Sequence, residues 1–111
     1  MPLIPEGVAD LSYAFENCTS LKNVTATPST VTSMWGTFIG CTSLTTAPDL
    51  SKATKLDNIA RAFYNCTSLT GIITLNANPT TYGSCLYNTQ ITAVNGTTTM
   101  ASTILATKTQ E

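Results

Sequence analysis

Four cysteines are the side chains of this chain that are best suited to covalent or metal chemistry: Cys18, Cys41, Cys66 and Cys85. They lie 23, 25 and 19 residues apart, whereas zinc sites use close pairs such as Cys-x-x-Cys, often with histidine. The chain contains no histidine, so the usual Ser-His and Cys-His catalytic pairs are absent. We therefore predict no metal site, no cofactor and no catalytic residue, and we do not expect an enzyme.

Cys18, Cys41 and Cys66 share one sequence context, because each is followed by Thr-Ser-Leu. We predict that they are buried free thiols that pack as small hydrophobic side chains. A disulfide between neighbouring repeats and a metal site are the alternatives, although three thiols in a row cannot all pair. Cys85 lies outside this pattern, and the sequence leaves its exposure open. Without a histidine or a basic cluster, nothing in the sequence lowers its thiol pKa.

The composition excludes several classes of function. Charged residues make up 10% of the 111 residues and the net charge is −1. The chain therefore lacks the excess of positive charge with which proteins bind nucleic acid. No apolar run approaches the length of a transmembrane helix. The chain holds 23 threonines and 9 serines, so we expect any partner to be engaged by hydrogen bonding and shape more than by charge.

The elements that position these residues follow from a repeat. The stretch Phe-x-x-Cys-Thr-Ser-Leu begins at Phe15, Phe38 and Phe63, and a weaker fourth copy aligns when Leu86 takes the phenylalanine position. Apolar residues recur around the motif at steps of 3, 4, 3, 3 and 3, and in the third copy this series ends at Ile72. The predicted core positions are Phe15, Phe38, Phe63 and Leu86; Cys18, Cys41 and Cys66; and Leu21, Leu44 and Leu69. Such self-similarity indicates a repeat architecture.

Each repeat predicts the same succession of elements. Apolar residues at i, i+3 and i+7 indicate a short helix or helical turn, and the β-compatible run after each leucine indicates a short strand. We therefore predict an α/β repeat solenoid of about four turns of 23–25 residues, with short parallel strands on one face and short helices or helical turns on the other. The predicted repeats are about 5–27, 28–47, 48–76 and 77–94, within a solenoid of residues 1–94. Residues 95–111 do not follow the spacing of the repeat. We predict that they form a strand or hairpin that caps the last turn, with a low-complexity tail as the alternative.

One candidate binding surface lies next to the phenylalanine positions. The residue that follows each one is Glu16, Ile39, Tyr64 or Tyr87, and in a stack these residues form a mostly apolar column with Trp35 exposed nearby. Exposed aromatic residues mark interfaces, so a contact patch is one interpretation. The other is packing between adjacent turns or against flanking domains.

A second candidate surface lies on the predicted strands. The residues just after each leucine, or after Ile91 in the fourth copy, are Lys22, Thr45, Thr70 and Thr92. Repeat proteins use such extended faces for binding, whereas a plain solvated strand surface would also favour threonine.

The motif Ala-Phe-x-x-Cys-x-Ser-Leu at this period resembles the BspA-like leucine-rich repeats of bacterial surface proteins. The mycoplasma-type Met-Phe-x-x-Cys repeats are related. The resemblance covers about residues 5–94 and implies a curved leucine-rich-repeat solenoid on extracellular proteins, with no catalytic residues. No leader precedes the first repeat in this sequence, so the resemblance implies a removed leader or an internal module beside flanking domains.

Together these observations predict a non-catalytic binding or adhesion module of a secreted or cell-surface bacterial protein. The expected partner is a protein or glycan on a host or neighbouring cell, with no nucleic acid and no membrane span. The alternative is a structural spacer, or a virion or tail-fibre domain, with no ligand of its own.

Overall fold

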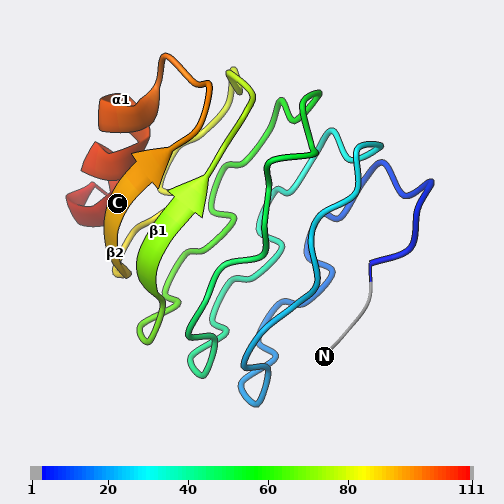
Figure 1. Ribbon diagram of the computed structural model, residues 1–111. Coiled ribbons are helices and arrows are strands. Elements are labelled where there is room, and N and C mark those ends of the chain that lie inside the picture. Colours follow the sequence, from blue (N-terminus) through cyan, green and yellow to red (C-terminus); the bar gives the residue numbers. More distant parts are fainter. Residues whose placement is uncertain (1–3, 111) are drawn as a thin grey trace.

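The repeats lie side by side, and the chain advances along the molecule by one repeat at a time, ending in a helix (Figure 1). The structure is a computed structural model that describes residues 4–110. Parallel backbone bridges join Asp10 to Ser33, Ser33 to Asn58, and Asn58 to Thr81. These bridges step by 23, 25 and 23 residues, so the fourth repeat follows the register in which Leu86 takes the phenylalanine position.

One face of the stack consists of successive turns. We call residues 11–18, 34–41, 59–66 and 82–89 the turn segments. Within them, backbone N–H groups donate to the carbonyl three residues back, as from Ala14 to Leu11 at 3.0 Å and from Cys18 to Phe15 at 3.1 Å. Among the described residues, none before residue 101 is helical. Of the predicted short helices or helical turns, this face therefore has turns and no helix among the described residues.

Backbone handedness explains why helices do not form there. Two positions in each turn segment have φ between 54° and 72°, in the left-handed region: Tyr13 and Asn17, Gly36 and Gly40, Arg61 and Asn65, and Ser84 and Asn88. A right-handed helix needs negative φ throughout. The other N–H groups of these segments donate to backbone carbonyls of the following repeat, as from Phe15 to the Thr37 carbonyl at 2.9 Å. The turns thus form a ladder between repeats, and steps of three and four residues fit such turns as well as they fit a helix face.

The other face carries the only regular strands of the described chain. Strand β1 (Thr70–Thr74) pairs in parallel with strand β2 (Gln90–Asn95), with a register shift between Gly71 and Ile72. The first two repeats contribute single hydrogen bonds here, such as Thr45 N–H to the Lys22 carbonyl at 3.1 Å, without forming strands. The expected strand in every repeat is therefore found only in the last two.

The register shift changes which residues face inward. Ile72, the expected last apolar position of the third repeat, is 50% exposed, whereas Ile73 is 3% exposed. The Cα partner of Thr70 is Gln90, so the expected alignment of Thr92 with Thr70 is also wrong. The extra residue at the register shift is Thr92 of β2, because Gly71 pairs with Ile91 and Ile72 pairs with Ala93.

The core lies between the two faces, and its side chains are most completely buried in the second and third repeats. Phe38, Cys41, Leu44, Cys66 and Leu69 are fully buried. In the first repeat, by contrast, Phe15 and Leu21 are half-buried and Cys18 is exposed. The prediction that Cys18 is a buried thiol is therefore wrong, because no other described repeat lies on the outer side of the first.

A helix closes the C-terminal end, in place of the expected strand or hairpin. Helix α1 (Ala101–Ala106) and the 3-10 helix η1 (Thr107–Thr109) lie beside the last repeat (Figure 1). Ile104 enters the core at 1% exposure. The Thr107 hydroxyl accepts a hydrogen bond from Leu86 N–H at 3.1 Å, and the Lys108 carbonyl accepts one from Asn88 N–H at 3.1 Å. These acceptors replace those that a further repeat would offer, which explains why a short helix can end the ladder.

Candidate functional site

A row of aromatic rings and one cation crosses all four turn segments. We call Tyr13, Trp35, Arg61, Tyr64 and Tyr87 the ring cluster. The Tyr13 and Trp35 rings lie 4.8 Å apart between centroids, and the Tyr64 and Tyr87 rings lie 5.3 Å apart. Arg61 joins these pairs, because its Cζ lies 5.9 Å from the Trp35 centroid and 5.3 Å from the Tyr64 centroid. A guanidinium within about 6 Å of a ring centroid makes a favourable cation–π contact, so the cluster is continuous from the first repeat to the fourth.

The turn backbone places these side chains on one surface. Tyr13 and Arg61 occupy the first left-handed position of their segments, with φ of 60° and 54°. Gly36 holds the same position in the second repeat and is buried. A Cβ atom on Gly36 would lie 2.9 Å from Ile39 Cδ1 and 3.0 Å from Tyr13 Cε1. Glycine therefore leaves the space in which the Tyr13 ring and the Ile39 side chain meet.

The cluster is partly packed and partly open to solvent. Tyr13 is 48% exposed, Arg61 is exposed, and Trp35, Tyr64 and Tyr87 are half-buried. The Tyr64 and Tyr87 rings stack on each other, so much of their faces is covered. What remains for a partner is a strip of ring edges and one guanidinium.

The strand-face column has a different chemistry. Lys22, Thr45, Thr70 and Thr92 are all exposed, as expected for that surface. The hydroxyls of the three threonines, however, donate to backbone carbonyls of the preceding repeat, at 3.4, 3.3 and 3.1 Å respectively. Since each hydroxyl has a single proton, these groups can accept hydrogen bonds from a ligand but have no proton left to donate.

The buried cysteines are held as protonated thiols. Cys41 Sγ donates to the Phe15 carbonyl and Cys66 Sγ to the Phe38 carbonyl, both at 3.0 Å. Burial raises the pKa of Cys66 to about 12 and that of Cys41 to about 11. All four cysteines are free thiols. At neutral pH these two thiols are therefore protonated, and the thiol is a much weaker nucleophile than the thiolate.

Across residues 4–110, no group of three or more cysteine or acidic side chains is arranged to hold a metal ion. No helix in that part of the chain has the length and apolar character needed to cross a membrane.

A family comparison accounts for the repeated turns, thiols and buried rings. The family model described as "BspA type Leucine rich repeat region (6 copies)" matches residues 4–105. The chain belongs to the BspA-type leucine-rich repeat family. Comparison with curated proteins and with solved structures finds no match.

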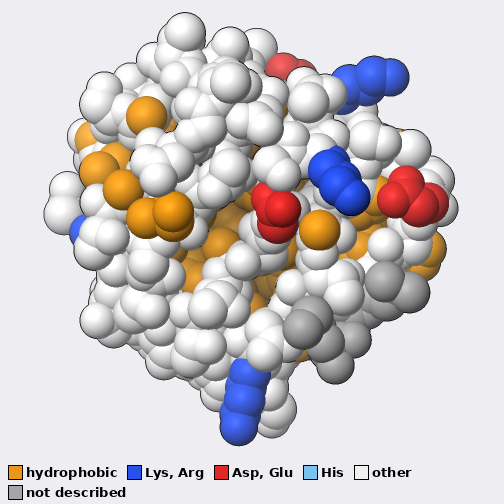
Figure 2. Space-filling view, viewed as in Figure 1, with side chains coloured by type: hydrophobic (Ala, Val, Ile, Leu, Met, Phe, Trp, Pro, Cys, Tyr) orange, Lys and Arg blue, Asp and Glu red, His pale blue; other side chains and the backbone are white. Residues whose placement is uncertain are grey.

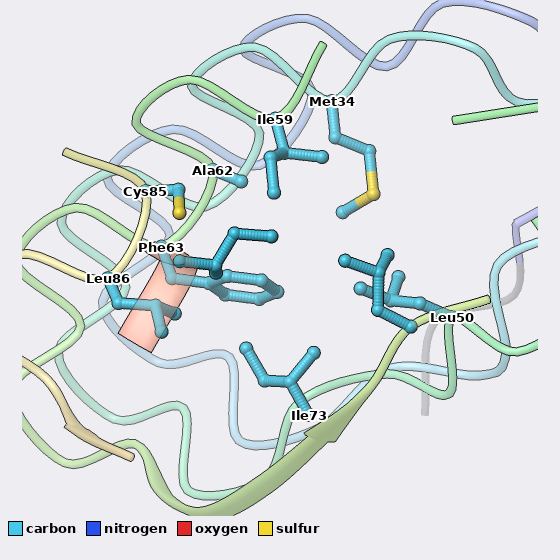
Figure 3. Close-up of a pocket in the computed structure, with 10 residues that line it drawn as sticks. Met34, Leu50, Ile59, Ala62, Phe63, Ile73, Cys85 and Leu86 are labelled. Atoms are coloured by element: carbon cyan, nitrogen blue, oxygen red, sulfur yellow. The ribbon is translucent and has the colours of Figure 1, made fainter. Parts of the chain in front are cut away.

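An apolar cavity lies between the BspA-type repeats, and its chemistry agrees with the non-catalytic character typical of this family. Its walls come from both faces and from α1, and they are formed by Met34, Leu50, Ile59, Ala62, Phe63, Ile73, Leu75, Cys85, Leu86 and Ile104 (Figure 3). Cys85, whose exposure the sequence left open, is 1% exposed, and burial raises its pKa to about 11. The cavity therefore offers no charged or basic group for acid–base or nucleophilic catalysis.

Sequence reasoning missed two members of the ring cluster in these BspA-type repeats. It selected Trp35, Ile39, Tyr64 and Tyr87 but not Tyr13 or Arg61. Both missed residues lie two positions before a phenylalanine. In a helix that position would point away from the tryptophan position, whereas the left-handed turn brings the two together. A prediction of left-handed turns in place of helices would have placed Tyr13 and Arg61 in the cluster.

Proposed function

We propose that this BspA-type chain is a leucine-rich-repeat solenoid that serves as a non-catalytic binding module of a bacterial surface protein. Its ligand is a protein or glycan on a host or neighbouring cell, bound on the turn face. Flanking domains carry the module at the cell surface or outside the cell. The ring cluster is the observation on which this proposal depends.

The composition of the ring cluster supports a binding role. Tyrosine, tryptophan and arginine are the residues enriched at the energetic centres of interfaces, and this strip contains all three. Its contacts hold the side chains in place before a partner arrives, so little side-chain entropy is lost on binding.

The rest of the surface supports recognition by shape and hydrogen bonds. Charged side chains are few and scattered on the face shown in Figure 2. Long-range electrostatic steering is therefore weak, and hydroxyl and amide groups provide most of the polar contacts. This surface suits a neutral glycan or an uncharged protein patch.

A structural spacer is the second candidate, and one observation favours it. The ring cluster packs mainly against itself, so its rings stabilise the join between repeats whether or not a ligand binds. A stalk element of a surface protein or a virion fibre would use the same contacts without a partner.

Arrays of glycans and of host and bacterial surface proteins, probed with the chain and with Arg61→Gln, separate the two functions. Arg61 is exposed, so its replacement leaves the core intact while removing the cation that joins Trp35 to Tyr64. Lys52→Gln removes the same charge from an exposed position outside the ring cluster and is the matched control.

The binding function predicts at least one reproducible ligand whose affinity falls roughly tenfold in Arg61→Gln, as for the loss of one interface contact of about 1.4 kcal/mol. Lys52→Gln should retain the affinity. No ligand on either array would favour the spacer, whereas equal losses in both variants would show that the ligand binds outside the ring cluster.

A further inference from the structure

Amide side chains line the turn face of the stack beside the ring cluster. We call Asn17, Asn65 and Asn88 the amide column. They occupy the second left-handed position of their turn segments, where the second repeat has Gly40. Asn17 and Asn88 are exposed and Asn65 is half-buried. In the third and fourth repeats these asparagines directly follow the two stacked tyrosines of the ring cluster, so amides and rings border each other.

The amide column is continuous across the repeats. Asn88 Nδ2 donates to Asn65 Oδ1 at 3.3 Å, which links the third and fourth repeats. A Cβ atom on Gly40 would collide with Asn17 Oδ1, so glycine lets the Asn17 side chain extend over the second repeat. Donors and acceptors both remain for a ligand, because Asn65 Nδ2 and Asn88 Oδ1 have no partner among residues 4–110.

Equivalent side chains of neighbouring repeats lie at a nearly constant distance. The ring centroids of Phe15 and Phe38 are 5.4 Å apart, those of Phe38 and Phe63 are 5.3 Å apart, and those of Tyr64 and Tyr87 are also 5.3 Å apart. This period suits a chain ligand whose own units repeat at the same distance. The rise of one pyranose unit in an extended β-1,4-linked polysaccharide is close to it, which places one sugar unit on each repeat.

The chemistry of the rings and amides also matches a sugar. A sugar hydroxyl both donates and accepts, so a row of hydroxyls needs the mixed donors and acceptors that amides provide. Arg61 adds N–H donors, because it forms no ion pair with any residue of 4–110 and its contacts with two rings hold it in place. The C–H groups of a pyranose pack against aromatic rings. None of these contacts requires a charged ligand.

Protein ligands match this surface less well. An extended peptide presents side chains to one surface at every second residue, about 6.7 Å apart, and therefore falls out of register with the repeats. A helix has a matching pitch of about 5.4 Å, but helices dock through an apolar stripe, whereas this surface includes a column of amides. The period and the hydrogen-bonding groups together favour a polysaccharide.

We propose that the turn face binds a linear, neutral polysaccharide that lies across the repeats, with one pyranose unit on each. This inference rests on the proposed binding function and names its ligand class. The three asparagines of the amide column exchange hydrogen bonds with sugar hydroxyls, Arg61 donates to them, and the rings contact sugar C–H groups. Four repeats therefore hold four sugar units.

The dependence of affinity on ligand length tests this binding mode. The probes are linear β-1,4-linked oligomers of glucose, mannose, xylose and N-acetylglucosamine, from the monosaccharide to the hexasaccharide, titrated calorimetrically into the chain. We expect at least one series whose affinity rises roughly tenfold or more from the disaccharide to the tetrasaccharide, because each added unit contacts a further repeat. Beyond four units the affinity should change less than about twofold. An affinity that does not rise beyond the disaccharide overturns the proposal.

Asn88→Gly removes the amide of the fourth repeat. Glycine retains the left-handed backbone, as Gly40 does in the second repeat. We expect the affinity for the tetrasaccharide to fall roughly threefold or more, so that the length dependence ends at three units. Asn23→Gly removes an exposed amide outside the turn segments and is the matched control, which should retain the parent's affinities.

Unchanged length dependence in Asn88→Gly, or equal losses in Asn88→Gly and Asn23→Gly, overturns the assignment of one unit to each repeat. If Asn88→Gly unfolds without a cooperative transition, Asn88→Asp replaces it, because aspartate also adopts this backbone conformation and lacks the amide donors.

The polysaccharide and the binding function fail in different ways. If no oligomer binds but the arrays identify a protein, or a branched or charged glycan, the polysaccharide is wrong and the binding function stands. If no oligomer binds and neither array gives a ligand, the binding function itself is wrong.

Discussion

The ring of Phe38 stacks on the ring of Phe63 with centroids 5.3 Å apart and planes 4° from parallel. On its other face Phe38 stacks on Phe15 at 5.4 Å and 3°. The three rings therefore form one continuous column through the first three repeats, and Phe38, which is fully buried, is its central member. The order of exposure along this column sets the order of the effects expected on truncation.

Phe38→Ala should be among the most damaging single substitutions in the chain. Removing a fully buried phenylalanine costs about 3–5 kcal/mol of unfolding free energy, and here it also leaves Phe15 and Phe63 without a stacking partner. Phe15→Ala is the matched control, because Phe15 is half-buried and stacks on one side only. Urea unfolding of the two variants measures the difference. A loss below about 1 kcal/mol for Phe38→Ala, or a larger loss for Phe15→Ala, would contradict the stacked column.

One thiol should react with Ellman's reagent in the native protein, and three more only after unfolding. Cys18 is exposed, whereas Cys41, Cys66 and Cys85 are buried and free. Titration before and after addition of denaturant counts both groups. Cys18→Ser should abolish the native reaction and leave the three slow thiols unchanged. Rapid reaction of a second native thiol would show that an interior join opens readily.

The repeat register was predictable from the sequence because it depends on the motif itself. The Phe-x-x-Cys-Thr-Ser-Leu copies and the placement of Leu86 fix which residues lie side by side, and the parallel bridges follow that register. Most buried positions follow directly from it. The exposure of Cys18 and the half-burial of Phe15 do not follow from it, because the same motif in the second and third repeats gives buried residues.

The turn geometry was harder to predict, although the sequence contains a signal for it. Asn17, Gly40, Asn65 and Asn88 occupy the second left-handed position of the four turn segments. Asparagine and glycine are the residues that most readily adopt this conformation, and their recurrence at one position argues against a helix. The first left-handed position holds Tyr13, Gly36, Arg61 and Ser84 and gives no such signal, which is why two members of the ring cluster were missed.

Two buried threonines should respond in opposite directions to replacement by valine. Thr27 and Thr37 are both fully buried, but the Thr27 hydroxyl has no hydrogen-bond partner among residues 4–110, whereas the Thr37 hydroxyl donates to the Leu11 carbonyl at 2.8 Å. Valine has nearly the same shape and no polar atom. Thr27→Val should therefore stabilise the fold by about 1 kcal/mol, and Thr37→Val should destabilise it by about 1 kcal/mol. Thermal or urea unfolding gives both values, and destabilisation by Thr27→Val would show that its hydroxyl has a partner.

The free energy of unfolding should fall at alkaline pH because of the buried thiols. Burial raises the pKa of Cys66 from its ordinary value of 9.0 to about 12 and that of Cys41 to about 11. The folded state therefore holds these protons more tightly than the unfolded chain does. Stability from this source is complete below about pH 9 and decreases as the pH rises towards 12.

Cys66→Ala isolates this contribution from the titration of other groups. The variant should be less stable than the parent near neutral pH, because it loses buried volume and the hydrogen bond to the Phe38 carbonyl. Between about pH 8 and about pH 10.5, however, its unfolding free energy should fall less steeply, so the gap to the parent narrows by roughly 2 kcal/mol. Urea unfolding under reducing conditions at a series of pH values measures both curves. Parallel curves would mean that the Cys66 thiol ionises equally easily in the folded and unfolded states, and hence that this position is open to water.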